Sequence, residues 1–124
     1  MTGIPRDLVH TEIYAQISGW ALVVLREPNR EPTVHVVGYI ARHDRLADDV
    51  GEPYIGSPLT HVDVERRLVR NLRGKVIALV GEPLPLGRLL EDLYGMMRRA
   101  ETEWNIEDGA TWERLEPGSP AVLQ

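Results

Sequence analysis

The sequence contains no cysteine and no phenylalanine, and no part of it is apolar for long enough to cross a membrane as a helix. The absence of cysteine excludes disulfides, thiolate metal ligands and a cysteine nucleophile, and it is compatible with a reducing compartment. Residues 1–7 have neither the basic start nor the apolar run of a signal peptide, and a membrane-spanning helix needs about 20 apolar residues. We therefore expect a cytoplasmic protein with no membrane partner.

Recognisable catalytic motifs are also missing. None of the serines lies in a G-x-S-x-G motif, and the glycines have no phosphate-binding spacing. His61 and Asp63 would share one face of a strand, a spacing that supplies half of a metal site, but no second pair stands out. We expect no catalytic residue, no metal and no cofactor. A small hydrolase that uses His61 and Asp63 is a third hypothesis, because the sequence does not determine whether they join a site in three dimensions.

A chain of 124 residues supports one hydrophobic core and therefore one domain. Its content of 43% hydrophobic and 27% charged residues is typical of a globular protein. We expect the domain to span residues 1–116 and residues 117–124 to form a flexible tail. The aromatic residues are tryptophans and tyrosines, whose polar atoms favour positions at the edge of the core or in interfaces.

Two patterns near the N-terminus predict strands. Residues 8–17 alternate between apolar and polar, which is typical of a half-buried strand. After a break at Ser18-Gly19, residues 20–25 form a nearly continuous apolar run, which indicates a strand covered on both faces. Residues 27–32 contain two prolines and predict a turn into a third strand at residues 33–42. 

Within that third strand, Gly38 is a candidate bulge or point of close approach. Residues 43–57 are expected to be the longest irregular loop. The loop carries four acidic residues, Asp44, Asp48, Asp49 and Glu52. Their order differs from that of calcium-binding loops, so we interpret the segment as a solvated acidic loop.

The second half of the chain predicts a meander and a helix. The meander consists of strands at residues 59–64, 67–72 and 75–80, joined by gaps of hairpin length. Apolar residues then recur at helical spacing from Leu86 to Trp104, with Pro85 suited to the first turn and Asn105 to the end. Residues 111–115 could add a short element. We expect the α+β class, with a curled antiparallel sheet of about six strands and one C-terminal helix packed on it.

The strands at residues 20–25 and 76–80 are apolar on both faces, whereas one helix covers a single sheet face. Curling of the sheet, the first strand, a second copy of the chain or another protein would have to cover the rest. On the helix, Gly95 lies between Tyr94 and Met96 and predicts close approach of another backbone. Tyr94 and the adaptable Met96 are candidate partner-binding residues.

Positive charge is concentrated in the meander, although the net charge of the chain is −5. The cations there are Arg66, Arg67, Arg70, Arg73 and Lys75. They are candidate contacts for an acidic protein or for phosphate, or they are a solvated strand and turn. Residues 66–75 contain no aromatic side chain to stack on bases.

One set of residues resembles a known pattern: Gly38-Tyr39, His43, Arg45-Leu46, Gly56-Ser57-Pro58, Asp63, residues 67–69, Gly74 and residues 79–81. Over residues 36–82 the chain resembles small uncharacterised β-meander domains of phages and prophages. It departs from their pattern at Gly56, Arg70, Arg73 and Val76, where those domains favour Thr, Thr, Ser and Tyr. The resemblance implies the meander fold and an origin in a mobile element, and that family has no established activity to transfer.

Small size, acidity, missing catalytic motifs and surplus apolar sheet surface favour a non-catalytic protein-interaction module, for example a phage-encoded regulator or inhibitor of a host factor. Its partner would be another protein or a second copy of the chain in a homodimer. The alternative is a nucleic-acid-binding module that uses the arginine-rich meander at residues 66–75.

Overall fold

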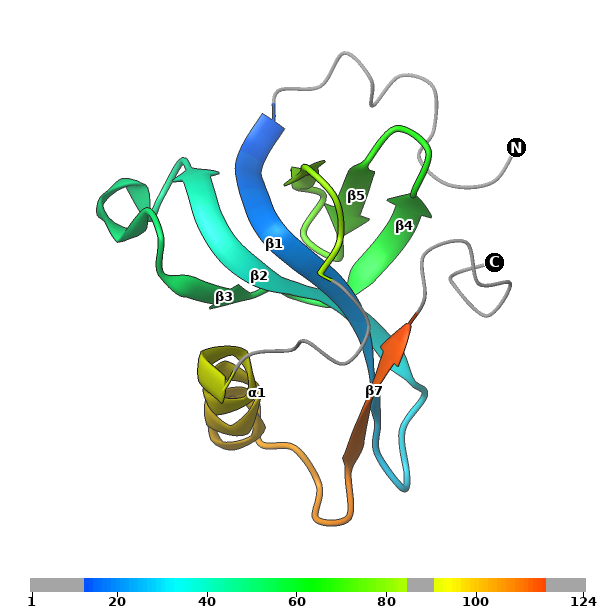
Figure 1. Ribbon diagram of the computed structural model, residues 1–124. Coiled ribbons are helices and arrows are strands. Elements are labelled where there is room, and N and C mark those ends of the chain that lie inside the picture. Colours follow the sequence, from blue (N-terminus) through cyan, green and yellow to red (C-terminus); the bar gives the residue numbers. More distant parts are fainter. Residues whose placement is uncertain (1–12, 85–90, 116–124) are drawn as a thin grey trace.

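The computed structural model describes residues 13–84 and 91–115 (Figure 1). The predicted start of the first strand, the first turn of the helix and the tail at residues 117–124 lie outside the described residues, as does the predicted domain limit. The elements are β1 (Ile13–Arg26), β2 (Thr33–His43), the 3-10 turn η2 (Ala47–Asp49), β3 (Pro53–Ile55), β4 (Leu59–Asp63), β5 (Leu68–Asn71), β6 (Val76–Val80), α1 (Glu91–Glu103) and β7 (Thr111–Leu115).

The described strands form one open sheet in the order β3-β2-β1-β6-β5-β4, and β7 pairs with β1 outside this path. The hairpin of β1 with β2 and the antiparallel meander of β4, β5 and β6 confirm the predictions for these segments. The α+β class, with a mostly antiparallel sheet and one helix, is confirmed, and the described sheet has seven strands where about six were expected. The antiparallel prediction was wrong for one pair, because β6 runs parallel to β1. Side-chain alternation reveals that a segment is a strand, but it carries no information on the direction of its neighbour.

The predicted break at Ser18-Gly19 was also wrong, since β1 continues through it as one strand. The register of β1 with β2 shifts twice there, so the strand bends at bulges instead of ending. Gly19 has a φ of +52°, and Gly38 lies opposite in contact with β1. A Cβ atom on Gly38 would lie 2.6 Å from Ile17 Cγ2 and 2.7 Å from the backbone oxygen of Ser18, which confirms the predicted close approach.

Two clusters of buried side chains lie on opposite faces of β1 and β2. One cluster includes Trp20, Leu22 and Val36 and joins them to residues of β4, β5, β6 and β7. The other cluster packs Leu93 and Met97 of α1 against the opposite face. The sheet is curved, so that β4 contacts β2 although β1 and other strands lie between them in the sheet order. Figure 1 shows β2 on one side of β1 and β4 and β5 on the other.

The apolar run in β1 is therefore covered by the chain itself, because every side chain from Trp20 to Leu25 is at most 4% exposed. The curled sheet buries one face of β1 and the helix buries the other, so neither a second copy of the chain nor another protein is needed to cover this strand. On β6, Val80 remains 40% exposed. A surplus of uncovered strand surface, the expected reason for docking, is not found on β1.

Residues 43–57 were expected to be irregular, but they contain η2 and β3, and β3 extends the sheet by pairing with β2. At the end of α1 the prediction for Asn105 is confirmed. Asn105 has a φ of +53°, its N–H donates to Thr102 O and the N–H of Ile106 donates to Glu101 O, which is the Schellman arrangement. Within the described ranges, α1 is too short and too polar to span a bilayer.

Candidate protein-binding groove

A groove of about 660 Å³ lies between α1 and the segment formed by η2 and β3. We refer to it as the helix groove. Its floor is apolar and its rim, where side chains are exposed, is charged. The floor residues are Ile40, Tyr54, Ile55 and Met96, and the rim residues are Leu46, Asp49, Glu52 and Arg99.

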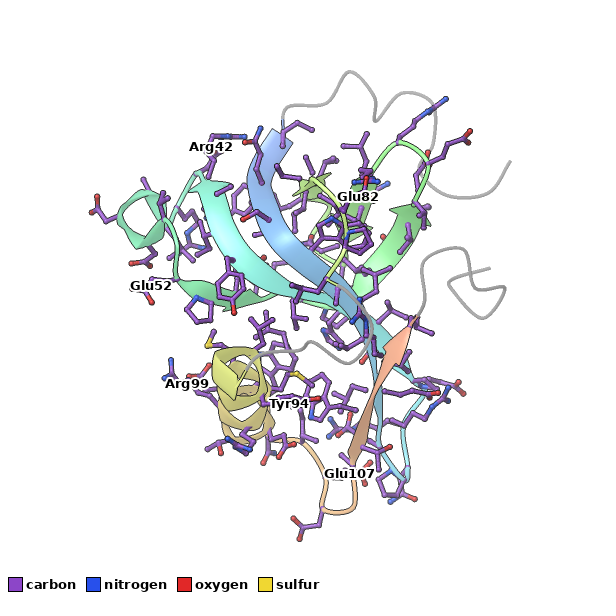
Figure 2. All side chains as sticks on the ribbon, viewed as in Figure 1. Arg42, Glu52, Glu82, Tyr94, Arg99 and Glu107 are labelled. Atoms are coloured by element: carbon purple, nitrogen blue, oxygen red, sulfur yellow. The ribbon has the colours of Figure 1, made fainter. Side chains whose placement is uncertain are left out.

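The two candidate partner-binding residues of the helix lie on different sides of it. Met96 lines the helix groove, whereas Tyr94 is 46% exposed and does not line it. Residues two apart in a helix are separated by about 200° around its axis, so Tyr94 and Met96 occupy opposite flanks. Figure 2 shows Arg99 on the flank beside Glu52 and Tyr94 on the other side of α1.

The close approach predicted at Gly95 is wrong. A Cβ atom at Gly95 would have no heavy atom within 4 Å, and the residue itself lines the helix groove. The glycine therefore leaves space in the groove instead of making room for a neighbouring backbone.

His43 holds the outer wall of the groove in place. Its Nδ1 accepts the backbone N–H groups of Arg45 and Leu46, both at 3.1 Å. The ring is 6% exposed and packs edge-on against Tyr14, with centroids 4.8 Å apart. Burial is the main cause that lowers the pKa of His43, which favours the neutral ring that these two hydrogen bonds require. 

The sequence analysis missed this role for His43. The available signal was a side-chain acceptor at the end of a strand, followed by backbone N–H groups two and three residues later. Asparagine and aspartate are the usual residues in that position, so a histidine there is easily overlooked.

The remaining polar groups of the groove are one neutral hydroxyl and three charges. Burial raises the pKa of Tyr54 to about 12, so its hydroxyl stays neutral. Within the described part of the chain, Asp49, Glu52 and Arg99 have no ion-pair partner, whereas Asp44 is paired with Arg42 at 2.7 Å. The rim therefore presents two free carboxylates on one wall and a free guanidinium on the other.

The meander cations are spread along the length of β5. Arg66 and Arg67 precede β5 and Arg73 and Lys75 follow it, so the two pairs lie at opposite ends of this strand. Arg66 pairs with Asp63 at 3.8 Å. Arg70 lies between the two pairs on β5 and is partly exposed.

Arg67 is engaged by other groups of the same chain. Its guanidinium donates to Gly81 O and to Glu82 Oε1 at 3.2 Å, and it lies over the ring of Trp20, 5.9 Å from the centroid. Lys75 is placed with its Nζ 5.1 Å from the ring centroid of Tyr14. Arg73 is exposed and lines a second cavity, described below.

His61 and Asp63 have separate local partners. His61 Nδ1 is 3.0 Å from the hydroxyl of Thr60, and Asp63 accepts the N–H of Arg66 at 3.0 Å. Neither residue lines the helix groove or the second cavity. Among the residues that the structure describes, no group of three or more His, Asp or Glu side chains is placed to hold a metal ion.

Comparison of the chain with known protein families, curated proteins and solved structures finds no match. The resemblance to phage and prophage domains therefore stays a prediction from the sequence.

Proposed function

We propose that the protein is a non-catalytic interaction module that binds a segment of another protein in the helix groove. Such a module acts by occupancy, as a regulator or an inhibitor does. The observation that supports this is an apolar floor open to solvent in a domain that covers the apolar run of β1 on both faces. Leu46, which also lines the groove, is 39% exposed. Clustered exposed apolar side chains with a charged rim are typical of protein-binding surfaces.

The charges of the rim indicate the chemistry of the partner. Asp49 and Glu52 are unpaired in the described part of the chain, and the net charge of the protein is −5. A segment that places apolar side chains on the floor and a lysine or arginine opposite these carboxylates would satisfy both features. Arg99 on the facing wall fits an acidic or carbonyl group of the same segment. A second copy of this acidic chain would bring like charges together, so a foreign basic segment fits better.

The test is to select, from a displayed library of short random peptides, those that bind the folded protein. We expect the selected peptides to combine apolar residues with Lys or Arg, and Met96→Glu to abolish their binding by placing a charge on the apolar floor. Tyr94→Glu is the matched control, since it adds the same charge to the opposite flank of α1 and should leave binding intact. Glu52→Lys should weaken the basic peptides and enrich acidic ones. Peptide binding that is unchanged by Met96→Glu and Glu52→Lys, or a failure to select any peptide, would refute the proposal.

Light scattering of the purified chain tests whether a second copy of the chain occupies the helix groove instead. We expect a monomer. A dimer that Met96→Glu converts to a monomer, with Tyr94→Glu still dimeric, would replace the foreign segment by a second copy and overturn the choice of partner.

The nucleic-acid alternative is supported less well by the positions of its cations. Binding to phosphates favours a continuous basic surface, whereas Arg66 and Arg73 lie at opposite ends of β5 and Arg67 is engaged with Gly81 and Glu82. We expect no mobility shift of single- or double-stranded DNA or RNA at low salt. A salt-sensitive shift that disappears in the combined variant Arg66→Gln, Arg70→Gln and Arg73→Gln would make this alternative the function instead.

A further inference from the structure

A second cavity, of about 360 Å³, lies where four segments distant in the sequence meet. It is bordered by the turn between β1 and β2, the connection from β3 to β4, the turn between β5 and β6, and the residues that follow α1. We refer to it as the His35 pocket. Its volume lies in the range of about 300 to 1,000 Å³ that is usual for small-ligand sites.

The inner part of the His35 pocket is mostly apolar. Leu25 and His35 are 3% and 1% exposed, and Trp104 stacks on the His35 ring with centroids 5.0 Å apart and planes inclined by 25°. Pro58 and Ile106 complete this surface, and Leu72 at its edge is 67% exposed. The pocket therefore offers a preformed apolar surface for a flat or branched ligand body.

The polar groups inside the pocket are already in use. His35 Nδ1 lies 2.9 Å from Gly56 O, so this nitrogen carries the proton and donates to the carbonyl. His35 Nε2 then accepts from the hydroxyl of Thr33 at 2.7 Å. With its proton committed, the Thr33 hydroxyl has only acceptor capacity left for a ligand, which disfavours an anion at the inner end.

The mouth of the pocket carries a free cation. Asn71 Oδ1 accepts the backbone N–H groups of Arg73 and Lys75, at 2.9 and 3.0 Å, and so fixes the turn from which Arg73 projects. In the described residues Arg73 has no ion-pair partner. Ser57, with no recorded hydrogen bond to the described residues, adds a hydroxyl donor to the lining.

The acids of the mouth limit the charge of a ligand. Glu27 is neutralised by Arg30 at 3.4 Å and also accepts the N–H of Glu107 at 3.0 Å. Glu31 is exposed and lines the pocket without an ion-pair partner among the described residues. A ligand with a double negative charge, such as a phosphate ester, would meet repulsion from this carboxylate, whereas a single charge can be balanced by Arg73.

We infer that the His35 pocket binds a small monocarboxylate, with its carboxylate at Arg73 and its apolar body against Trp104, Ile106 and Leu25. This site is separate from the helix groove, and neither depends on the other.

Phenylacetate is the probe, followed through the indole N–H signals of the full chain in two-dimensional nitrogen–proton NMR. The tryptophans provide an internal control. Trp104 lines the pocket, while Trp20 is 1% exposed and donates its indole N–H to Gly81 O at 3.0 Å, away from the pocket. We expect millimolar or tighter binding that shifts the Trp104 signal and leaves that of Trp20 unchanged. Phenylacetamide, which has the same shape without the charge, should bind about tenfold more weakly because a charge-assisted hydrogen bond is lost.

Arg73→Gln should weaken phenylacetate about tenfold and leave phenylacetamide unaffected. Arg66→Gln, an arginine of the same meander at the opposite end of β5, is the matched control and should change neither affinity. An unshifted Trp104 signal at saturating probe would overturn the inference. So would equal binding of benzylamine, or Arg73→Gln and Arg66→Gln behaving alike, because the carboxylate would then not be recognised at Arg73.

Discussion

The imidazole of His35 lies stacked on the indole of Trp104, with ring centroids 5.0 Å apart, and so ties the middle of the sheet to the residue that follows α1. Trp112 of β7 meets the same ring edge-on, at 5.9 Å. His35 on β2 thus contacts both the residue after α1 and β7, which are distant from it in the sequence. A charge on this ring would be placed in the apolar interior, so its protonation state bears on the stability of the whole domain.

Stability should fall as the solution becomes acidic. Burial is the main cause that lowers the pKa of His35 below its ordinary value of 6.5, while the hydrogen bond to Gly56 acts in the opposite direction. Below that ordinary value the unfolded chain binds more protons at this residue than the folded chain, so the free energy of unfolding decreases with falling pH. Above it both states are neutral and the full stability is present. Urea denaturation at about pH 7.5 and about pH 5 measures the difference.

His35→Gln should be less stable than the original chain at about pH 7.5 but should lose part of the dependence on pH. His43 contributes in the same direction, since its pKa is also lowered, so some dependence will remain. If His35→Gln and the original chain lost the same free energy between the two pH values, the buried ring would not be responsible.

Replacing His43 should loosen the wall of the helix groove in a residue-specific way. His43→Leu removes the acceptor for the N–H groups of Arg45 and Leu46 while keeping an apolar side chain in the buried site. His43→Asn retains an acceptor, because an asparagine oxygen commonly accepts N–H groups two or three residues ahead. Hydrogen exchange of the Arg45 and Leu46 amides should therefore be faster in His43→Leu than in His43→Asn. Equal exchange in the two variants would show that the ring acts by packing alone.

Two glycines should respond oppositely to alanine. Gly38→Ala places a Cβ atom 2.6 Å from Ile17 Cγ2 and 2.7 Å from a backbone oxygen, so the strands must separate, at a cost of about 1 to 3 kcal/mol. Gly95→Ala meets no atom within 4 Å and gains about 1 kcal/mol from the better helix propensity of alanine. Thermal or urea unfolding of both variants measures this. A destabilised Gly95→Ala would mean that another group occupies the space beside α1.

Arg67→Gln should cost about 1 kcal/mol, because it removes hydrogen bonds to Gly81 and Glu82 that are partly screened by solvent. Arg66→Gln removes only a long, partly exposed ion pair with Asp63 and should change stability by less than about 0.5 kcal/mol. Urea denaturation of the two variants compares them directly. Similar values would indicate that the contacts of Arg67 with Trp20 and Gly81 contribute nothing to folding.

Much of the local structure was predictable from the sequence. The prolines at residues 27–32 placed the hairpin, and Asn105 marked the end of α1, because both act through backbone dihedral preferences of single residues. Gly38 was predictable for a different, steric reason, since a residue without a side chain is needed against Ile17. The bend of β1 at Ser18-Gly19 was mistaken for a break, because a bulge and a turn use the same residue types.

The candidate sites were predictable only in part. Met96 was identified, but its neighbours in the helix groove come from η2 and β3, in a segment that the sequence presented as an irregular loop. Arg67 was chosen as a contact for partners because its charge is visible in the sequence, whereas its engagement with Trp20 and Gly81 depends on packing between β1, β5 and β6. Nothing in the sequence links Arg73 with Trp104.

By itself, the sequence determined most of the strands and the helix, though not β3, where the hairpin turns lie, and that familiar catalytic motifs are missing, since these depend on residue type and on periodicity over a few positions. Only the tertiary structure decided that β6 runs parallel to the first part of β1, that β7 pairs with the last part of β1, and that both faces of β1 are covered. The reason is physical. Strand pairing is selected by the sum of contacts between distant residues, and the helix groove and the His35 pocket are the spaces left where those distant segments meet.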